Sequence, residues 1–326
     1  MARLIKRLAW TLPVLVLILA MDFAVLHLPD TISAFDLNAG TRLEAAEIKS
    51  QHEAFRERFR LDEPLIPRFF DWMGSALRFD FGDSMREPRS VREIIGAALP
   101  ATLWIQTTTL LLMFALGIPL GVFMASRRDA NWDRGLRASC YGMQSIPDFW
   151  IATILLVFFA TRAGWAIFPL EGISDPDAAT FGWLSWFADR LHHLVLPVLA
   201  LALPGLAFIA RITRNSLVEE LSRDWVTTAR AQGISERAIL WRFGLKNAMV
   251  PVATVFGGVL PGLIGGSVVV ERIFNIQGIG QLAFQSTLDR DFPVLQALLL
   301  LTAVLTLIGY ALSDVLVAAL DPRTQR

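Results

Sequence analysis

Long apolar runs separated by charged segments dominate the pattern of this 326-residue chain. Each run is close to the length of about 20 residues that a helix needs to cross the hydrocarbon core of a bilayer. Backbone polar groups find no water there, so each run must satisfy its own hydrogen bonds, as a helix does. We therefore predict an all-α membrane protein with about six transmembrane helices, near Leu8–Leu28, Leu99–Met124, Leu136–Ala160, Leu194–Ile212, Val250–Val270 and Val294–Leu320.

The first run admits two interpretations. Basic residues near the N-terminus followed by an apolar stretch are typical of a cleavable signal peptide. However, the apolar stretch continues past Asp22 to Leu28, and no small-x-small cleavage pattern follows Ala20. We therefore expect residues 1–28 to form a cytoplasmic N-terminus and a retained first transmembrane helix.

The distribution of Lys and Arg predicts the orientation, because short cytoplasmic loops carry an excess of these residues. Basic residues gather in the segments 127–137 and 211–246, which fall on the same side of a six-span arrangement as the two termini. We therefore predict that both termini are cytoplasmic. Residues 29–98 then form a small periplasmic segment, and residues 99–326 form a core of five spans with a cytoplasmic loop at residues 211–249.

Composition supports a membrane protein and excludes one class of partner. The chain is 54% hydrophobic and only 18% charged, whereas soluble domains carry about 25% charged residues. Its net charge is zero, so no bulk attraction to nucleic acid is expected, and membrane lipid is the expected surrounding. The single cysteine, Cys140, lies in the third run, so no disulfide can form within the chain.

The fifth run contains an unusual number of glycines. Small residues four positions apart let helices approach closely. However, so many glycines also destabilise a helix and make it easy to bend. We predict that this run bends or lines a path through the membrane, with helix breaks at Pro147 in the third run and at Pro261 here. The residues predicted to line the path are Gly258, Pro261, Gly262, Gly265 and Gly266.

Motifs for catalysis are missing from the sequence. There is no G-x-x-x-x-G-K-[ST] phosphate loop, no H-E-x-x-H, no nucleophile elbow and no C-x-x-C. The adjacent His192 and His193 have no cysteine or carboxylate cluster around them, so we predict neither a metal site nor a catalytic residue. If the protein uses ATP, hydrolysis must take place on another polypeptide, and this chain needs a cytoplasmic surface that receives the force.

The loop between the fourth and fifth runs is the candidate for that surface. The residues from Asp224 to Arg237 read as a helix, a glycine break and a second helix. Gly233 suits the position just after a helix, where a left-handed conformation is needed, and Ser235 suits the N-cap of the next helix. Two short helices at an angle form a protruding knob that a partner can grip in a groove. The alternative is an ordinary solvated loop.

Residues Asp224–Pro251 resemble the cytoplasmic EAA loop of ABC-importer permeases, in the form found in the dipeptide, oligopeptide and nickel transport family. The resemblance covers nearly the whole chain, and its long first external segment is similar to that of the B-type subunit. The segments that carry it are Leu61-Asp62-Glu63-Pro64-Leu65, Phe81-Gly82-Asp83-Ser84, Leu99-Pro100-Ala101-Thr102, Gly117-Ile118-Pro119-Leu120-Gly121, Ser145-Ile146-Pro147-Asp148-Phe149-Trp150, Glu271-Arg272-Ile273-Phe274, Gly278-Ile279-Gly280 and Asp321-Pro322-Arg323.

The resemblance implies a multi-pass permease of the bacterial inner membrane with the type I ABC-importer fold. It implies a second homologous permease subunit, two cytoplasmic ABC ATPase subunits that carry ATP and Mg, and a periplasmic substrate-binding protein. This chain would bind no cofactor of its own. The coupling region would comprise Thr228, Ala229, Arg230, Gly233, Ile234, Ser235 and Glu236. The glutamate that gives the EAA loop its name is replaced here by Thr227, which puts in doubt any ion pair from that position to an ATPase.

The resemblance leaves the substrate and the energy source as the open questions. Peptides are the best-supported cargo, and nickel chelates or glycosides are the alternatives within the family. A secondary transporter driven by an ion gradient is the rival from another class, but it predicts paired intramembrane charges, and such charges are sparse here. A membrane-embedded enzyme is a further rival, although the sequence shows no catalytic cluster.

Overall fold

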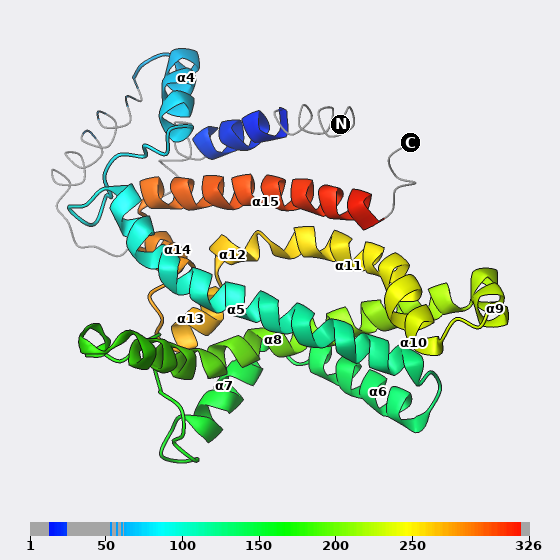
Figure 1. Cartoon of the computed structure of the whole chain (residues 1–326). Helices are drawn as coiled ribbons and strands as arrows, with labels where there is room; N and C mark the ends of the chain where they lie inside the picture. The colour runs from blue at the N-terminus through cyan, green and yellow to red at the C-terminus, as the bar shows by residue number, and fades with distance from the viewer. Residues whose placement is uncertain (1–12, 25–52, 54–56, 58–59, 61, 321–326) are drawn as a thin grey trace. The chain divides into compact units, whose positions relative to one another are not determined.

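The computed structural model describes residues 13–24, 53, 57, 60 and 62–320, and the regular secondary structure of these residues is helical (Figure 1). The apolar helix Pro13–Ala24 comes first. The helices that follow it are α4 (Leu65–Ala76), α5 (Val91–Ser126), α6 (Asn131–Ser145), α7 (Asp148–Phe159), the short η1 (Ala178–Thr180), α8 (Trp183–Leu221), α9 (Asp224–Ala231), α10 (Glu236–Ala238), the π-helix η2 (Ile239–Gly244), α11 (Leu245–Val259), α12 (Gly262–Gly265), α13 (Val268–Ile273), α14 (Ile279–Asp289) and α15 (Phe292–Leu320).

The chain divides into two compact units. The smaller unit comprises residues up to Ala97 together with Leu282–Val304, and the larger one comprises Ala98–Gln281 together with the residues from Leu305 onward. The helices α5 and α15 each contribute residues to both units. Within the expected periplasmic segment, the charged sequence Glu44–Arg60 is typical of a helix, but it lies outside the described residues apart from the isolated positions named above. The C-terminal Asp321-Pro322-Arg323 also lies outside them.

Aromatic packing holds the smaller unit together. Phe23 of the helix Pro13–Ala24 packs edge-on against Phe69 of α4, with ring centroids 5.3 Å apart. Leu19 is buried with Leu300 of α15 in the same apolar cluster. In the segment before α5, Ser84 donates a hydrogen bond to the buried carboxylate of Asp291. Phe69 therefore lies on a helix that packs against its neighbours.

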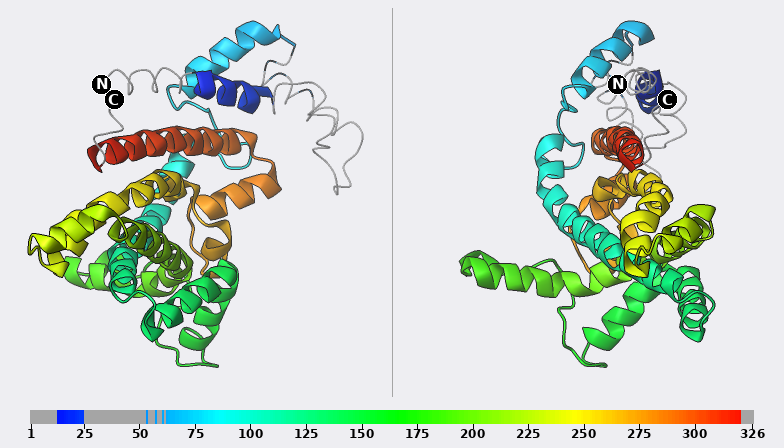
Figure 2. Two further views of the ribbon diagram at one scale, coloured as in Figure 1. Left: turned by 90° about the vertical axis from the view of Figure 1, so that its right-hand side faces the viewer. Right: turned by 45° about the vertical axis from the view of Figure 1, so that its right-hand side comes forward.

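Helix α8 is the centre of the larger unit. Its 39 residues form one continuous helix despite two internal prolines, as Figure 2 shows. It packs against α6, α7 and α11. The predicted fourth span covers only its middle, because hydropathy marks the apolar part of a helix and not its polar ends. His192 and His193 consequently lie inside α8 and not before it.

Close backbone approach brings α5 against α8. A Cβ atom at Gly117 would lie 3.0 Å from the Cβ of Ile209, and one at Gly121 would lie 2.5 Å from the carbonyl oxygen of Ala210. Only glycine fits at such distances, and dispersion contacts then form along the backbones. The GxxxG pattern of the second run is therefore a packing feature of the larger unit.

Within the part of the chain that the structure describes, three helices are long and apolar enough to cross a membrane: α5, α8 and α15. The pair α6 and α7 passes the same test together, but it bends by 97° at the break before Asp148. The expected break at Pro147 is therefore confirmed, and it is sharper than a kink, because proline restricts the residue before it to extended conformations. The six-span count and the orientation remain predictions.

The fifth apolar run is not a single helix. Helix α11 ends at Val259 and α12 begins at Gly262, so the expected break at Pro261 is confirmed. A second break follows at Gly266, whose φ of 65° lies in the left-handed region that favours glycine. The run is thus divided into α11, α12 and the start of α13, which follows from its high glycine content.

Candidate functional site

A Schellman turn ends α9 and forms the tip of the loop between α8 and α11. The backbone N–H of Gly233 donates to the carbonyl of Arg230 at 3.0 Å, and that of Ile234 donates to Ala229 at 3.1 Å. Gly233 has a φ of 76°. These two bonds satisfy carbonyls that a helix end otherwise leaves unpaired, and the left-handed residue between them favours glycine. The helix, glycine break and second helix expected from the sequence are all present.

The segment after Gly233 begins with a side-chain cap. The hydroxyl of Ser235 accepts the backbone N–H of Ala238 at 3.3 Å, which is the N-cap geometry. Beneath the turn, Val226 and Ile239 are fully buried in a small apolar cluster. The knob, which we define as residues 224–244, therefore has a core of its own.

Most of the predicted coupling residues lie on the surface of the knob. Thr228, Arg230, Gly233, Ser235 and Glu236 are exposed. Ala229 is buried, and Ile234 is half-buried against the apolar cluster. Two of the seven predicted residues thus support the turn from inside, and five are available to a partner.

An ion pair spans the turn. The guanidinium Nε of Arg230 donates to Glu236 at 2.7 Å. This hydrogen bond holds the pKa of Glu236 below its usual value. Since the folded-state pKa is the lower one, the stabilisation is present above the ordinary pKa of a glutamate and is lost as the pH falls through the lowered value. Both side chains are exposed, so the pair contributes little to overall stability.

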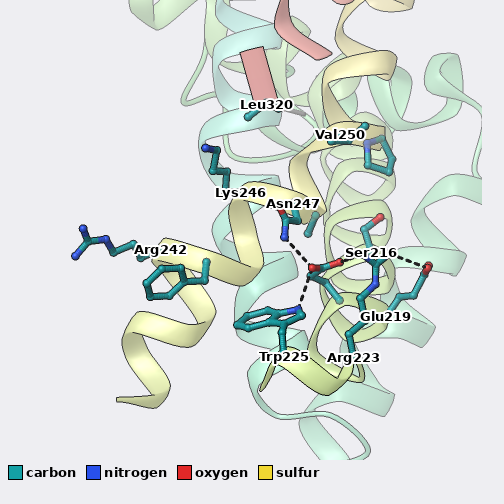
Figure 3. A pocket seen from close by; sticks show the side chains of 13 residues that line it. Ser216, Glu219, Arg223, Trp225, Arg242, Lys246, Asn247, Val250 and Leu320 are labelled. Carbon is teal, nitrogen blue, oxygen red and sulfur yellow. Dashed lines mark hydrogen bonds and ion pairs between the residues drawn. The ribbon is translucent and has the colours of Figure 1, made fainter. Parts of the chain in front are cut away.

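An open pocket of about 830 Å³ lies at the base of the knob, between the end of α8, the start of α9 and the first turns of α11. Figure 3 shows Trp225 and Asn247 pointing toward the same carboxylate. That carboxylate belongs to Glu220, which is buried. The exposed rim carries Arg242 and Lys246. The sequence interpretation did not single out Glu220, because a glutamate near a helix end usually faces solvent.

A buried ion pair joins α6 to α8 close to the same end of α8. Arg214 contacts Asp133 through two nitrogens, at 3.1 Å and 2.7 Å. The Asp133 side chain is completely buried, and that of Arg214 is 10% exposed. Arg214 had been counted only as one of the basic residues that predict a cytoplasmic loop. The structure shows that it is a structural residue with a fixed partner.

The glycines of the fifth run divide between two environments. A Cβ atom on Gly258, Gly262 or Gly265 would have no heavy atom within 4 Å, so these positions border open space. In contrast, a Cβ on Gly266 would lie 2.6 Å from an oxygen of Glu271. Three of the five predicted path residues therefore border open space. Gly266 belongs to a packed turn, and Pro261 lies at the helix break.

That packed turn is organised by Glu271, which is 1% exposed. Its carboxylate accepts the hydroxyl of Thr102 at 2.9 Å and the backbone N–H of Gln281 at 2.9 Å. Thr102 in turn accepts the backbone N–H of Ile279 at 2.7 Å. A Cβ on Gly278 would lie 2.5 Å from the Thr102 hydroxyl oxygen, which explains the glycine there. These bonds fix the chain after the broken fifth run.

The two adjacent histidines are accounted for by protein contacts. A ring nitrogen of His192 lies 3.0 Å from the carbonyl of Ile167, and one of His193 lies 3.0 Å from that of Asp189. Among the described residues, no group of three or more His, Cys, Asp or Glu side chains is arranged to hold a metal ion.

Replacing Ser235 with alanine is expected to loosen the second half of the knob. Loss of an N-cap side chain costs about 1 kcal/mol, so amides within Glu236–Gly244 should exchange with solvent about fivefold faster. The measurement is hydrogen exchange followed by mass spectrometry. Ser139→Ala is the matched control, because the Ser139 hydroxyl bonds only to Gly135 of its own helix. Equal protection in both variants would remove the assigned cap.

Comparisons with known proteins identify the class to which this arrangement belongs. Residues 117–326 match the family described as "Binding-protein-dependent transport system inner membrane component". That match covers more than half of the chain and includes the knob, the broken fifth run and the Glu271 turn. The chain therefore belongs to this family, and it is a multi-pass permease of the inner membrane.

Individual relatives are similar along their whole length. The chain is 34% identical over 325 residues to the oligopeptide transport system permease protein AppB of Bacillus subtilis, covering 99% of both chains. It is 34% identical over 320 residues to a probable peptide ABC transporter permease of Sinorhizobium fredii, covering 98% of both. It is also 34% identical over 318 residues to the glutathione transport system permease protein GsiC of Escherichia coli, covering 98% of this chain and 97% of that one.

Proposed function

We propose that this chain is one of two permease subunits in an ATP-driven importer that moves peptides delivered by a periplasmic binding protein. The observation that carries the proposal is the exposed knob with its Gly233 turn, in a chain that belongs to a binding-protein-dependent transport family. A transport subunit without a phosphate loop needs such a surface to receive force from elsewhere.

The proposed partner of the knob is a cytoplasmic ABC ATPase. The exposed residues Thr228, Arg230 and Glu236 are available to a groove on that subunit, and a short amphipathic helix is a common way to dock into one. Two ATPase subunits would hold the ATP and Mg, and a second homologous permease would present an equivalent knob. This chain supplies no catalytic residue and no cofactor site.

The proposed topology places the knob in the cytoplasm. Six spans, with both termini cytoplasmic, put residues 29–98 in the periplasm and residues 211–249 on the ATPase side. The basic residues of the knob support this orientation. In this topology the first span lies within residues 1–28 and the remaining five spans lie within residues 99–326.

The proposed path runs past the broken fifth run. Gly258, Gly262 and Gly265 border open space, and the break at Pro261 would let this run change shape between inward- and outward-facing states. Non-helical backbone at membrane depth is tolerated where it lines a cavity. Pro261 and Gly266 contribute to the path through the conformation of the run.

Peptides are the proposed cargo because the relatives named above are peptide, oligopeptide and glutathione permeases. Nickel chelates and glycosides are the alternatives with the same machinery. Selection among these would rest mainly on the binding protein, since the broken run, residues 250–270, contains no charged side chain.

Reconstitution tests the proposal. We expect the chain, co-purified with its co-expressed neighbours in proteoliposomes, to import a labelled di- or oligopeptide only when ATP and the binding protein are both present. ATP hydrolysis should rise when the loaded binding protein is added. A non-hydrolysable ATP analogue is the control for energy source. Uptake that persists without any ATPase subunit, driven by an imposed ion gradient, would show a secondary transporter instead.

A further inference from the structure

We propose that Glu220 ties the knob to the cytoplasmic ends of α8 and α11, so that a displacement of the knob moves both helices together. Glu220 is thus a positioning residue, and its role rests on the function proposed above. It lies at the second-last position of α8. No sequence motif points to it, and its assignment depends on contacts between three elements.

The contacts of Glu220 converge on one carboxylate. Its Oε1 accepts the indole N–H of Trp225 at 3.1 Å, from α9. The same oxygen accepts the side-chain amide of Asn247 at 2.7 Å, from α11. Its Oε2 lies 2.9 Å from a guanidinium nitrogen of Arg223, in the turn between α8 and α9. One side chain therefore bonds to the coupling helix α9, to the long helix α11 and to the turn between α8 and α9.

Burial makes these bonds strong. The Glu220 side chain is 5% exposed, and a buried carboxylate must have its lone pairs satisfied by donors. Hydrogen bonds to an ionised acceptor are stronger than those between neutral groups. A movement of α9 or α11 away from α8 would break at least one of them and leave the buried carboxylate with fewer donors.

The apolar contacts beneath the knob constrain its angle less. Val226, Ala229 and Ile239 form one apolar cluster, and Leu240 packs in a second with Leu217 of α8. The hydrophobic effect that holds such clusters together is not directional. Hydrogen bonds are directional, so the Glu220 carboxylate supplies the angular constraint that force transmission needs. Trp225 takes part in both, since its ring packs against the cluster and its N–H reaches Glu220.

The test compares two neighbouring glutamates in the complete importer. In Glu220→Ala, the number of ATP molecules hydrolysed per peptide imported should rise by at least about tenfold, because the variant loses two hydrogen bonds to a charged acceptor and an ion pair. Glu219→Ala is the matched control, because Glu219 is 76% exposed and only approaches Arg223 at 3.7 Å. Its ratio should stay within about twofold of the wild type, as for other exposed ion pairs.

The ratio of ATP hydrolysed to peptide imported distinguishes a positioning role of Glu220 from a role in stability alone. A destabilised but correctly coupled complex would lose ATP hydrolysis and import in parallel, and its ratio would not change. An unchanged ratio in assembled Glu220→Ala would overturn the proposal. Where that variant does not assemble, Glu220→Gln and Trp225→Phe carry the same test with smaller changes of shape.

A double-mutant cycle with Glu220→Gln and Trp225→Phe adds an independent readout. If the two side chains act through their shared bond, the effects on the ratio should be clearly less than additive. Additive effects would overturn the proposal. The wild-type importer is measured in the same preparation: if it shows no ATP-driven import, the proposed function fails, whereas failure confined to the variants concerns Glu220 alone.

Discussion

Gly233→Val is expected to reduce ATP-driven import by about tenfold while the chain still inserts into the membrane. The reason is the backbone of the turn. Gly233 has a φ of 76°, and a residue with a Cβ pays roughly 1–2 kcal/mol in the left-handed region, with β-branched residues the least suited to it. That energy shifts the population of the turn by a factor of about 5–30, and the knob loses its shape.

The space around Gly233 makes this prediction specific. No heavy atom lies within 4 Å of a Cβ placed there, so valine meets no steric clash and its effect must come from the backbone conformation. Asparagine tolerates the left-handed region, so Gly233→Asn is the control and should retain most of the import. The measurement is peptide uptake normalised to the amount of membrane-inserted chain. Normal uptake by Gly233→Val would remove the knob from the coupling mechanism.

Asp133→Ala is expected to destabilise the larger unit by about 3–5 kcal/mol, because it leaves the buried Arg214 without a carboxylate partner. Asp133 also accepts the backbone N–H of Asp129 at 3.0 Å, so the substitution also loses a support for the turn before α6. The measurement is the thermal unfolding of the purified chain in detergent.

Removing both charges should cost much less than removing one. In the double variant Asp133→Leu, Arg214→Met, apolar side chains of similar size replace the pair, and such replacements are often close to neutral. The double variant should therefore melt at a higher temperature than Asp133→Ala. If both melt equally low, the loss comes from packing around α6 and not from an uncompensated charge.

The features predicted correctly from the sequence share a local cause. The break at Pro147 follows from the geometry of proline, and the turn at Gly233 follows from a helix end that needs a left-handed residue. The cap at Ser235 follows from the pairing of its hydroxyl with an N–H three residues on. In each case the interaction that determines the structure joins residues a few positions apart, so the local sequence is enough to predict it.

The features that the sequence did not reveal depend on distant partners. Asp133 and Arg214 are 81 positions apart, and nothing near either residue indicates the other. Glu220 is similar, since Asn247 comes to it from α11 and not from its own helix. The length of α8 was also missed, because the residues before Leu194 and after Ile212 include polar and charged side chains and do not continue the apolar run. The placement of the spans in a membrane remains a prediction.

Helix α8 is long enough for a small tilt to move its ends by several ångströms. Its 39 residues extend about 58 Å at 1.5 Å per residue, almost twice the hydrocarbon thickness of about 30 Å. A tilt of about 5° therefore displaces one end by about 5 Å relative to the other, which is comparable to one helical turn. Pro197 and Pro204 interrupt its hydrogen bonds near the middle. Arg214 and Glu220 hold the part of α8 that follows these prolines. We therefore expect a displacement of one end of α8 to bend the helix near Pro197 and Pro204.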